Sequence, residues 1–280
     1  MSDEIFEQVF QVTGPARLEV NNIRGSVDIR PGADGVVTVK AVKQVDTGDA
    51  KRTEIEIKQE SDGTVKASTR FPEVTLGWLT GSKPCEVDYT ITAPRACALK
   101  VNGVSNDTFV EGFEGEASLK TVSGDLTMRA LNGALSLNSV SGDMELADLT
   151  GSLRLNTVSG DISGAHLSGT ASLNTVSGDI EFEQSSLSSV DATTVSGDMD
   201  LETALGEGPY KFNSVSGEVK LKVPTDTRCT AELHSISGDI STKLPATSVS
   251  RHNGTQTVEV QGGGVKVYLH SVSGDMELKS

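Results

Sequence analysis

Residues Thr121–Asp179 read TVSGDLTMRALNGALSLN, SVSGDMELADLTGSLRLN, TVSGDISGAHLSGTASLN and TVSGD, which is one unit of 18 residues written three times and begun a fourth. Self-similarity at a fixed short period is typical of structural units that stack on one another, because a single unit cannot bury its apolar side alone. The repeat therefore predicts an array of near-identical coils.

The valine of the motif shows how far the array extends. Its spacing is 18 residues up to Val176 and then grows to 19, 20, 21 and 36. We therefore expect an array that is regular in its first half and looser towards the C-terminus. The motif positions are Val104, Val122, Val140, Val158, Val176, Val195, Val215, Ile236 and Val272.

Each unit contains two short runs in which apolar residues alternate with polar ones, such as Leu126/Met128 and Leu135/Leu137. A two-residue period belongs to a half-buried strand and not to a helix. Short strands separated by a glycine every nine residues suit a coil that rises by one strand spacing, about 4.8 Å, per circuit. The predicted fold is all-β: a single-stranded parallel β-solenoid, or β-helix, of about 18-residue coils. The handedness and the number of sides stay open.

A column of glycines follows the motif serine, with Gly124, Gly142, Gly160 and Gly178 in the regular part. In the first copy Asn106 takes the place of glycine. Asparagine is the commonest residue after glycine at positive φ. We therefore predict a structural corner with left-handed backbone at each of these glycines.

Residues 1–102 are expected to form an N-terminal β region. Leu18–Val27 aligns without gaps onto Leu153–Ile162, which indicates a degenerate coil. Alternating runs between about 30 and 97 indicate an antiparallel β elaboration that caps the solenoid end. Within it, Trp78 and Leu79 lie in a loop rich in Pro and Gly; they either plug the end of the core or form an exposed binding tip.

Residues 103–280 are expected to form the solenoid repeat domain. The gap after Ile236 is longer than one coil and contains Asn253-Gly254 between two alternating runs. Asn-Gly in that setting is a strong hairpin signal, so we predict a hairpin insertion near 247–260. After it, the chain returns into a last motif, SVSGDMEL.

Charge is distributed unevenly. The chain has a net charge of −15; residues 1–102 hold 15 acidic and 13 basic side chains, and residues 103–280 hold 24 and 11. An acidic field repels phosphate, which argues against nucleic acid and against anionic membrane surfaces as partners. The sequence shows no signal peptide and no apolar run that could insert in a membrane, so a cytoplasmic location is expected, with the cell surface reached only by another export route. The odd number of cysteines, Cys85, Cys97 and Cys229, favours free thiols.

The motif acids should form a row along the array, with Asp125, Asp143, Asp161 and Asp179 in its regular part. Carboxylates about 4.8 Å apart repel one another, so something must offset the repulsion. Calcium is one candidate and a hydrogen bond from backbone N–H at each corner is the other. The absence of a double-glycine calcium pattern favours the backbone, and no cofactor or metal is expected. A second column of Asn138, Asn156, Asn174 and Asn213, continued by His234 and His270, predicts a ladder of side-chain hydrogen bonds.

No nucleophile beside a base, and no carboxylate pair set against a basic residue, can be recognised in the repeat. The sequence therefore predicts a protein that is not an enzyme. Tandem [ST]-V-S-G-D-[IM] units from Val104 to Leu278, with Gly262-Gly263-Gly264 before the last SVSGDMEL, resemble a bacterial family of β-strand-repeat proteins regarded as candidate adhesins. The resemblance implies a β-solenoid in a bacterial protein and, through the adhesin label, attachment to cells.

The leading functional hypothesis is a binding or scaffold module that presents a rigid acidic face to a protein partner or to itself. Two alternatives remain: a calcium-stabilised cell-surface adhesin and, more remotely, a polysaccharide-active β-helix enzyme. Self-association is expected through the C-terminal coil, because Met276 and Leu278 would otherwise leave an uncovered strand edge.

Overall fold

The computed structural model describes residues 2–72, 82–252 and 254–280. Within these ranges the chain is all-β, as predicted, and no helix has the length and apolar character needed to cross a membrane. The chain forms two compact units, Met1–Ser136 (unit 1) and Leu137–Ser280 (unit 2). The boundary expected near residue 102 stays a prediction.

The described residues of unit 1 form nine strands and the start of a tenth. They are β1 (Glu4–Gln11), β2 (Ala16–Pro31), β3 (Val36–Gln44), β4 (Glu54–Gln59), β5 (Val65–Arg70), β6 (Glu86–Ala93), β7 (Cys97–Glu111), β8 (Ala117–Ser123), β9 (Leu126–Arg129) and β10 (Asn132–Ser141).

Unit 2 contains the end of β10 and all later strands. They are β11 (Met144–Ala147), β12 (Thr150–Ser159), β13 (Ile162–Ala165), β14 (Ser168–Ser177), β15 (Ile180–Ser196), β16 (Met199–Thr203), β17 (Tyr210–Ser216), β18 (Val219–Lys222), β19 (Cys229–Ser235), β20 (Ile240–Thr242), β21 (Ala246–His252), β22 (Thr255–Val260), β23 (Val265–Ser273) and β24 (Met276–Lys279).

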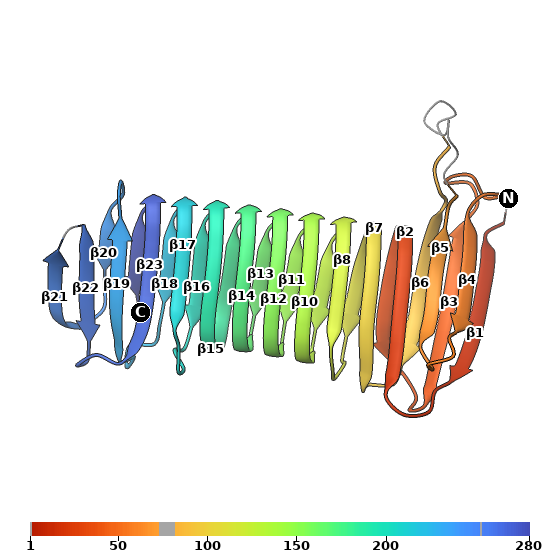
Figure 1. Ribbon diagram of the computed structural model, residues 1–280, viewed down its shortest axis with the longest axis horizontal. Coiled ribbons are helices and arrows are strands. Elements are labelled where there is room, and N and C mark those ends of the chain that lie inside the picture. The colour runs from red at the N-terminus through yellow and green to blue at the C-terminus, as the bar shows by residue number, and fades with distance from the viewer. Residues whose placement is uncertain (1, 73–81, 253) are drawn as a thin grey trace. The chain divides into compact units, whose positions relative to one another are not determined.

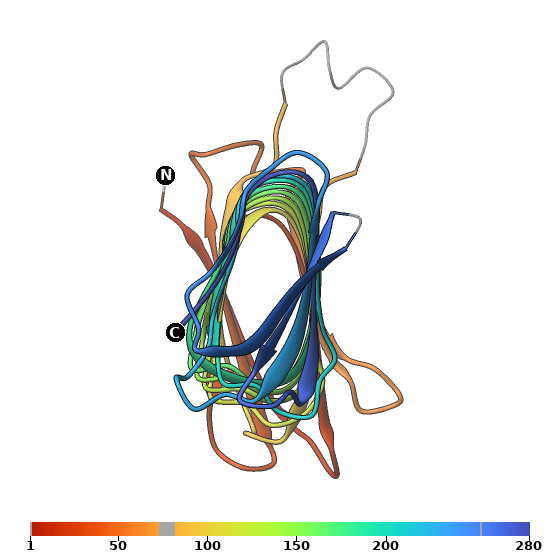
Figure 2. The same cartoon turned by 90° about the vertical axis from the view of Figure 1, so that its left-hand side faces the viewer.

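Each coil of unit 2 has two sides. A longer strand such as β12 is followed by the Ser-Gly-Asp corner and a shorter strand such as β13, and the next coil repeats the pair (Figure 1). Neighbouring coils pair in parallel one period apart, with Thr150 opposite Ser168 and Met144 opposite Ile162. Figure 2 shows the strands of unit 2 superposed in two facing layers. The number of sides, which the sequence left open, is therefore two.

The core of unit 2 lies between these layers. Leu153 and Leu155 on β12 and Ile162 on β13 are at most 2% exposed, as the alternation predicts. At one place a neighbouring coil makes room for a large buried ring. Phe182 is 1% exposed beside Gly164, whose missing side chain leaves space for the ring.

The last coil in the sequence is not the last coil of the stack. β23 pairs in parallel with both β17 and β19, and β24 pairs with both β18 and β20 (Figure 1). Met276 and Leu278 are therefore 1% and 0% exposed. The expectation that the C-terminal coil leaves an open edge for self-association is wrong, because the coil of β19 and β20 covers it.

Antiparallel strands complete both units. The predicted hairpin is present in unit 2, where β21 pairs with β22 and β22 with β19. In unit 1, β1 pairs with β3, β3 with β6 and β4 with β5, all antiparallel. The predicted elaboration is thus mixed, since β5 and β6 also pair in parallel with β2.

A buried lysine fastens β1 and the turn after β3 in unit 1. The Lys43 ammonium donates to the carbonyl oxygens of Ala50 and Thr53 at 3.0 and 3.2 Å, and it pairs with Glu4 of β1 at 2.6 Å. Lys43 is 5% exposed, so a charge here needs these partners. All three cysteines are free and buried, and burial raises the pKa of Cys97 to about 12.

Glu19 joins three neighbouring strands of unit 1. Its carboxylate accepts from the Asn21 amide at 3.1 Å and pairs with Lys66 of β5 at 3.0 Å and with Lys100 of β7 at 3.4 Å. The Asn21 hydrogen bond first, and then Lys66, lower the pKa of Glu19 from 4.5 to about 2. The ionised form is therefore favoured in the folded state.

We predict an acid-dependent loss of stability that depends on Glu19. A lowered pKa stabilises the fold above the unfolded pKa of 4.5, and this stability is lost as the pH falls towards 2. After discounting for solvent at the partly exposed carboxylate, the contribution is about 1–2 kcal/mol. Urea midpoints measured near pH 6 and near pH 3 should fall more for the wild type than for Glu19→Gln. Glu116→Gln, at an exposed site of the same unit, is the control and should behave as wild type.

Candidate binding face

The longer strands of unit 2 carry the side chains that form its most regular surface. The Asn174 amide donates to Asn156 Oδ1 at 3.0 Å, and the Asn156 amide donates to Asn138 Oδ1 at 3.1 Å. The predicted ladder is therefore present. It is interrupted at Thr193, which stands opposite Asn174, and resumes at Asn213.

The ladder ends in two histidines instead of amides. The His270 and His234 rings lie 5.3 Å apart between centroids, and His234 Nδ1 is 3.1 Å from Thr255 Oγ1. Both rings thus continue the column of stacked polar side chains.

The motif valines form an exposed stripe two residues beyond the asparagine ladder. We call the members in unit 2 the valine stripe: Val140, Val158, Val176, Val195, Val215, Val272 and Ile236 in stack order. The valines are each 45–48% exposed and Ile236 is 72% exposed. They are kept outside because strand alternation gives the inward positions to their neighbours, such as Thr157, which is 5% exposed. A contiguous exposed apolar row of this kind marks an interaction site.

The acidic row borders the valine stripe at the corner. Motif carboxylates along the row accept a hydrogen bond from the backbone N–H of the motif acid in the next coil of the stack. The bonds run from Asp161 to Asp143 (2.9 Å), Asp179 to Asp161 (2.8 Å), Asp198 to Asp179 (2.8 Å), Glu218 to Asp198 (2.8 Å), Asp239 to Asp275 (2.8 Å) and, in unit 1, Asp125 to Asp107 (3.1 Å). Backbone satisfaction is thus present, but the donor belongs to the neighbouring coil and not to the same corner.

These hydrogen bonds occupy one oxygen of each carboxylate and hold the row in place. In the ranges that the structure describes, His, Cys, Asp and Glu do not gather in groups of three or more that could hold a metal. Calcium binding by the acidic row, which the adhesin alternative requires, stays a prediction. So does the opposite expectation, that the row binds no metal.

The corner glycines are required by close approach of the coils more than by φ. Gly124 and Gly178 have φ of 129° and 153°, as predicted, whereas the φ of Gly160 lies outside the left-handed range. A Cβ on Gly160 would lie 2.4 Å from the carbonyl oxygen of Gly142, and one on Gly178 would lie 2.2 Å from that of Gly160. Asn106 is not among the described non-glycine residues with positive φ, so the first copy of the motif does not share the left-handed corner found at Gly124 and Gly178.

A shallow groove lies on the same side of unit 2, over β12, β14, β15 and β17. It measures about 350 Å³, and its lining includes Ser152, Arg154, Thr170, Asp191 and Lys211. A register shift between Gly169 and Thr170, where β14 meets β15, accompanies this hollow. The groove adds hydroxyl groups and charges of both signs beside the asparagine ladder.

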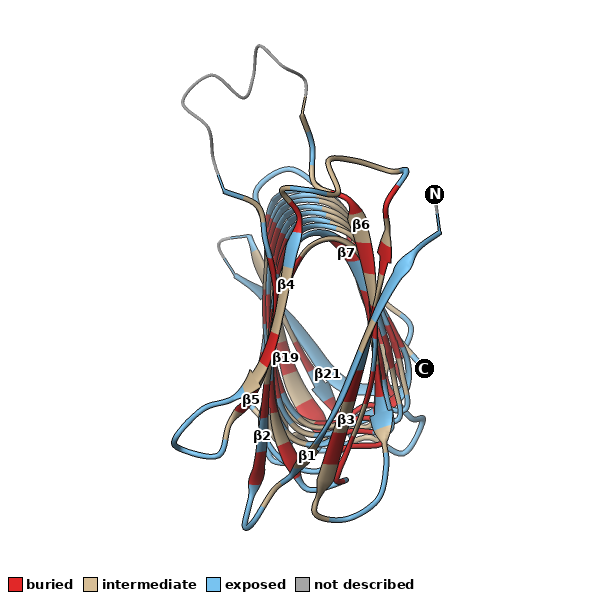
Figure 3. Cartoon of the chain, turned by 90° about the vertical axis from the view of Figure 1, so that its right-hand side faces the viewer, coloured by how far each residue is buried: buried red, intermediate tan, exposed pale blue. Residues whose placement is uncertain are grey.

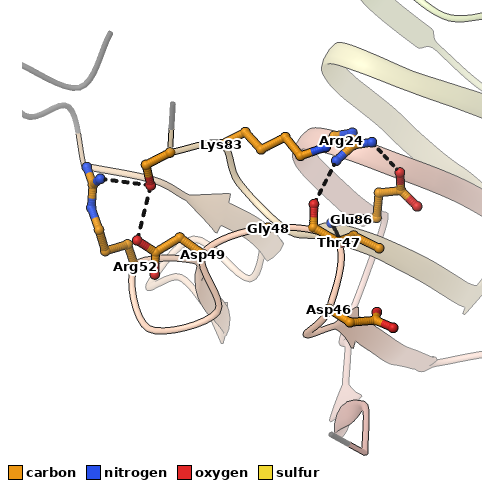
Figure 4. Close-up of a pocket in the computed structure, with 9 residues that line it drawn as sticks. Arg24, Asp46, Thr47, Gly48, Asp49, Arg52, Lys83 and Glu86 are labelled. Carbon is orange, nitrogen blue, oxygen red and sulfur yellow. Dashed lines mark hydrogen bonds and ion pairs between the residues drawn. The ribbon is translucent and has the colours of Figure 1, made fainter. Parts of the chain in front are cut away.

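Unit 1 has a separate cleft of about 810 Å³ beside the turn after β3. Arg24 pairs with Glu86 at 2.6 Å and donates to the Thr47 carbonyl at 3.2 Å (Figure 4). Arg52 donates to the Ser82 hydroxyl at 3.2 Å, which in turn donates to Asp49 at 3.1 Å. Both guanidinium groups are thus engaged by the chain itself.

The predicted tip at Trp78 and Leu79 lies outside the described residues. The exposure of the valine stripe was not predicted from the sequence, although the alternation of inward and outward residues along the strand indicates it. If Leu153 and Leu155 face inward on β12, Val158 must face outward.

The Toastrack DUF4097 model matches residues 16–279, which is nearly the whole chain and includes every repeat. The chain belongs to the Toastrack DUF4097 family. No curated protein matches it.

Solved structures similar to this Toastrack chain share little sequence with it. A candidate cell adhesion protein from Clostridium sporogenes is 11% identical, with 99% of each chain covered and a TM-score of 0.30. A candidate adhesin from Parabacteroides distasonis is 13% identical over 99% of this chain and 97% of that one, with a TM-score of 0.45. A candidate lipid-binding protein from the same organism is 15% identical over 98% and 96%, with a TM-score of 0.47.

Proposed function

We propose that this Toastrack chain is a non-enzymatic binding module whose repeat is a single-stranded parallel β-solenoid. Its binding face is the valine stripe together with the acidic row beside it. The observation that carries the proposal is the exposure of seven aligned apolar side chains on one side of unit 2. A partner that fits this face is a protein with an apolar ridge flanked by basic residues.

The side chains of the binding face are held in place by hydrogen bonds within the chain, which supports this role. The asparagine ladder and the carboxylate-to-backbone bonds fix the side chains on both borders of the valine stripe. The β-branched valines themselves have few rotamers to lose on binding. A face that is ordered before binding loses little conformational entropy, which favours affinity.

Charge sets the class of partner. The acidic row runs along one border, so complementary basic residues would steer the encounter and fix the register, while the apolar stripe would supply most of the affinity. Like-charged surfaces, including nucleic acid, would be repelled.

The proposal predicts that polar replacement of the stripe removes partner binding. In the variant Val158→Thr, Val176→Thr and Val195→Thr the side chains keep their shape and β-propensity but lose apolar surface. At about 1 kcal/mol for each half-exposed valine, affinity should fall about 100-fold. The immobilised 280-residue chain should therefore recover far less bound protein from an extract of its native host.

A matched triple variant on the opposite layer serves as the control. Ser163→Thr, Glu181→Gln and Asp200→Asn change outward side chains of β13, β15 and β16 and should leave the recovered proteins unchanged. Equal recovery by the valine variant and the wild type would contradict the proposal.

A further inference from the structure

Unit 1 exposes one edge of β1. Among the described strands β1 pairs with β3 alone, from Glu4 opposite Lys43 to Gln11 opposite Val36. Its other edge has no strand partner among the described strands, although at its C-terminal end the Gln11 carbonyl accepts a hydrogen bond from the Gln59 amide of β4 at 3.2 Å. Ile5 and Val9 are 63% and 59% exposed, so apolar side chains accompany the open edge. Much of β1 is coloured as exposed in Figure 3.

Unit 2 exposes one edge of β21. This strand pairs with β22 alone among the described strands, and all seven of its residues are exposed. Val249 is 54% exposed. β21 is the outermost strand of unit 2 in Figure 1.

The other outer strands are protected or too short. On β4, Lys58 pairs with Glu56 at 3.1 Å and with Glu60 at 3.2 Å, and such charges on an edge discourage pairing. β20 has only three residues, Ile240–Thr242. Among the described outer strands, β1 and β21 are the long ones that carry exposed large apolar side chains beside their charges, namely Ile5, Val9 and Val249.

The two edges are complementary in charge. The segment around β1 carries Asp3, Glu4 and Glu7, and residues 2–11 contain no basic side chain. β21 carries Arg251 and His252, and residues 246–252 contain no acidic side chain. The strands are also similar in length, eight and seven residues.

We propose that β1 of one copy adds antiparallel to the open edge of β21 in a second copy. With Glu4 opposite Arg251, the register places Phe6 opposite Val249 and Asp3 opposite His252. Residues directly opposite in an antiparallel pair lie on the same face of the sheet, so each of these pairs is in contact. Glu4 keeps its ion pair with Lys43, because half of its side chain is exposed.

This contact is heterologous, since it joins two different surfaces of the chain. Each added copy brings one free β1 and one free β21, so association leads to head-to-tail assemblies, either open chains or closed rings. The surface is separate from the valine stripe, and assembly would repeat that stripe along a chain of copies. The partner in this proposal is a second copy of the same chain.

The test blocks one end at a time in the 280-residue chain. Ile5→Lys with Val9→Lys blocks β1, and Val249→Lys blocks β21. Analytical ultracentrifugation should show that the mass of the wild type grows with concentration, whereas each blocked variant stays monomeric. An equimolar mixture of the two variants should form dimers and nothing larger, because only one free β1 edge and one free β21 edge remain to pair.

Ser163→Lys, on an outward position away from both edges, is the control and should assemble as wild type does. A wild type that stays monomeric throughout, a blocked variant that still self-associates, or a mixture that grows beyond a dimer would each overturn the proposal. Circular dichroism melting verifies that each variant is folded. If a lysine variant fails to fold, Ile5→Ser and Val249→Ser replace it, and each should reduce association in the same direction.

Discussion

Replacing Gly160 by alanine should lower the free energy of unfolding by about 3 kcal/mol, although only one methyl group is added. That methyl would lie 2.4 Å from the carbonyl oxygen of Gly142, so the two coils must separate locally. Overpacking costs about 1–3 kcal/mol, and each strained hydrogen bond between the coils adds about 1 kcal/mol. A loss of this size lowers the Tm by about 6–12 °C, which calorimetry measures directly.

Gly262 is the control position, because alanine there tests the strain of left-handed backbone without a close contact between coils. Gly262 has φ of +82°, and the nearest atom to its added Cβ would be 4.0 Å away. Gly262→Ala should therefore cost only the strain of a left-handed alanine, about 1 kcal/mol. If the two variants lose the same stability, the account based on the contact between coils fails.

The second large effect is expected in the core column formed by Leu146, Gly164, Phe182 and Leu201, which are in register on successive coils. A Cβ on Gly164 would lie 2.7 Å from Leu167 Cδ1 and 3.0 Å from the Phe182 ring, so the volume next to Gly164 is shared with the Phe182 ring and with Leu167. Phe182→Leu alone leaves a cavity and should cost about 1–2 kcal/mol. Gly164→Leu alone overfills the site and should cost about 1–3 kcal/mol.

The double variant has leucine at both positions, as in the neighbouring coils. Its loss of stability should be smaller than the sum of the losses of the two single variants. A coupling of about 1–3 kcal/mol is expected from chemical denaturation. Phe212, 0% exposed on β17, provides the control. Gly164→Leu combined with Phe212→Leu should be additive, and additivity in the Gly164–Phe182 pair would disprove the shared volume.

Several features of the face could be predicted from particular residues. Leu153 and Leu155 alternate with Arg154 and Asn156 along β12. This alternation places the two leucines in the core and the two polar residues on the outer face of the strand. A period of 18 residues then puts each side chain next to its counterpart, so the asparagine ladder and the acidic row follow from the same reasoning. The exposure of Val158 follows too, if the alternation of inward and outward residues is continued from Leu155 into the motif.

The role of the corner glycines was predicted only in part. Sequence statistics attribute such glycines to positive φ, and Gly178 fits that reason. Gly160 is required because the backbone of the neighbouring coil, at Gly142, lies too close for a side chain. These two residues are 18 apart in the sequence, so no local sequence pattern reveals the contact. The donor to each carboxylate was misplaced for the same reason, since it comes from the neighbouring coil.

By itself, the sequence determined the coil, because strand parity and the 18-residue period act locally and repeat. The tertiary structure decided the order in which the last coils stack. SVSGDMEL resembles every other copy, so β24 can pair as well with β18 as with β20, and it pairs with both. Near-identical coil faces accept one another whatever their order in the chain, and only the packing of the whole of unit 2, with β22 closing over β19, selects one arrangement. That selection buries the C-terminal strand and leaves β21 at the open edge.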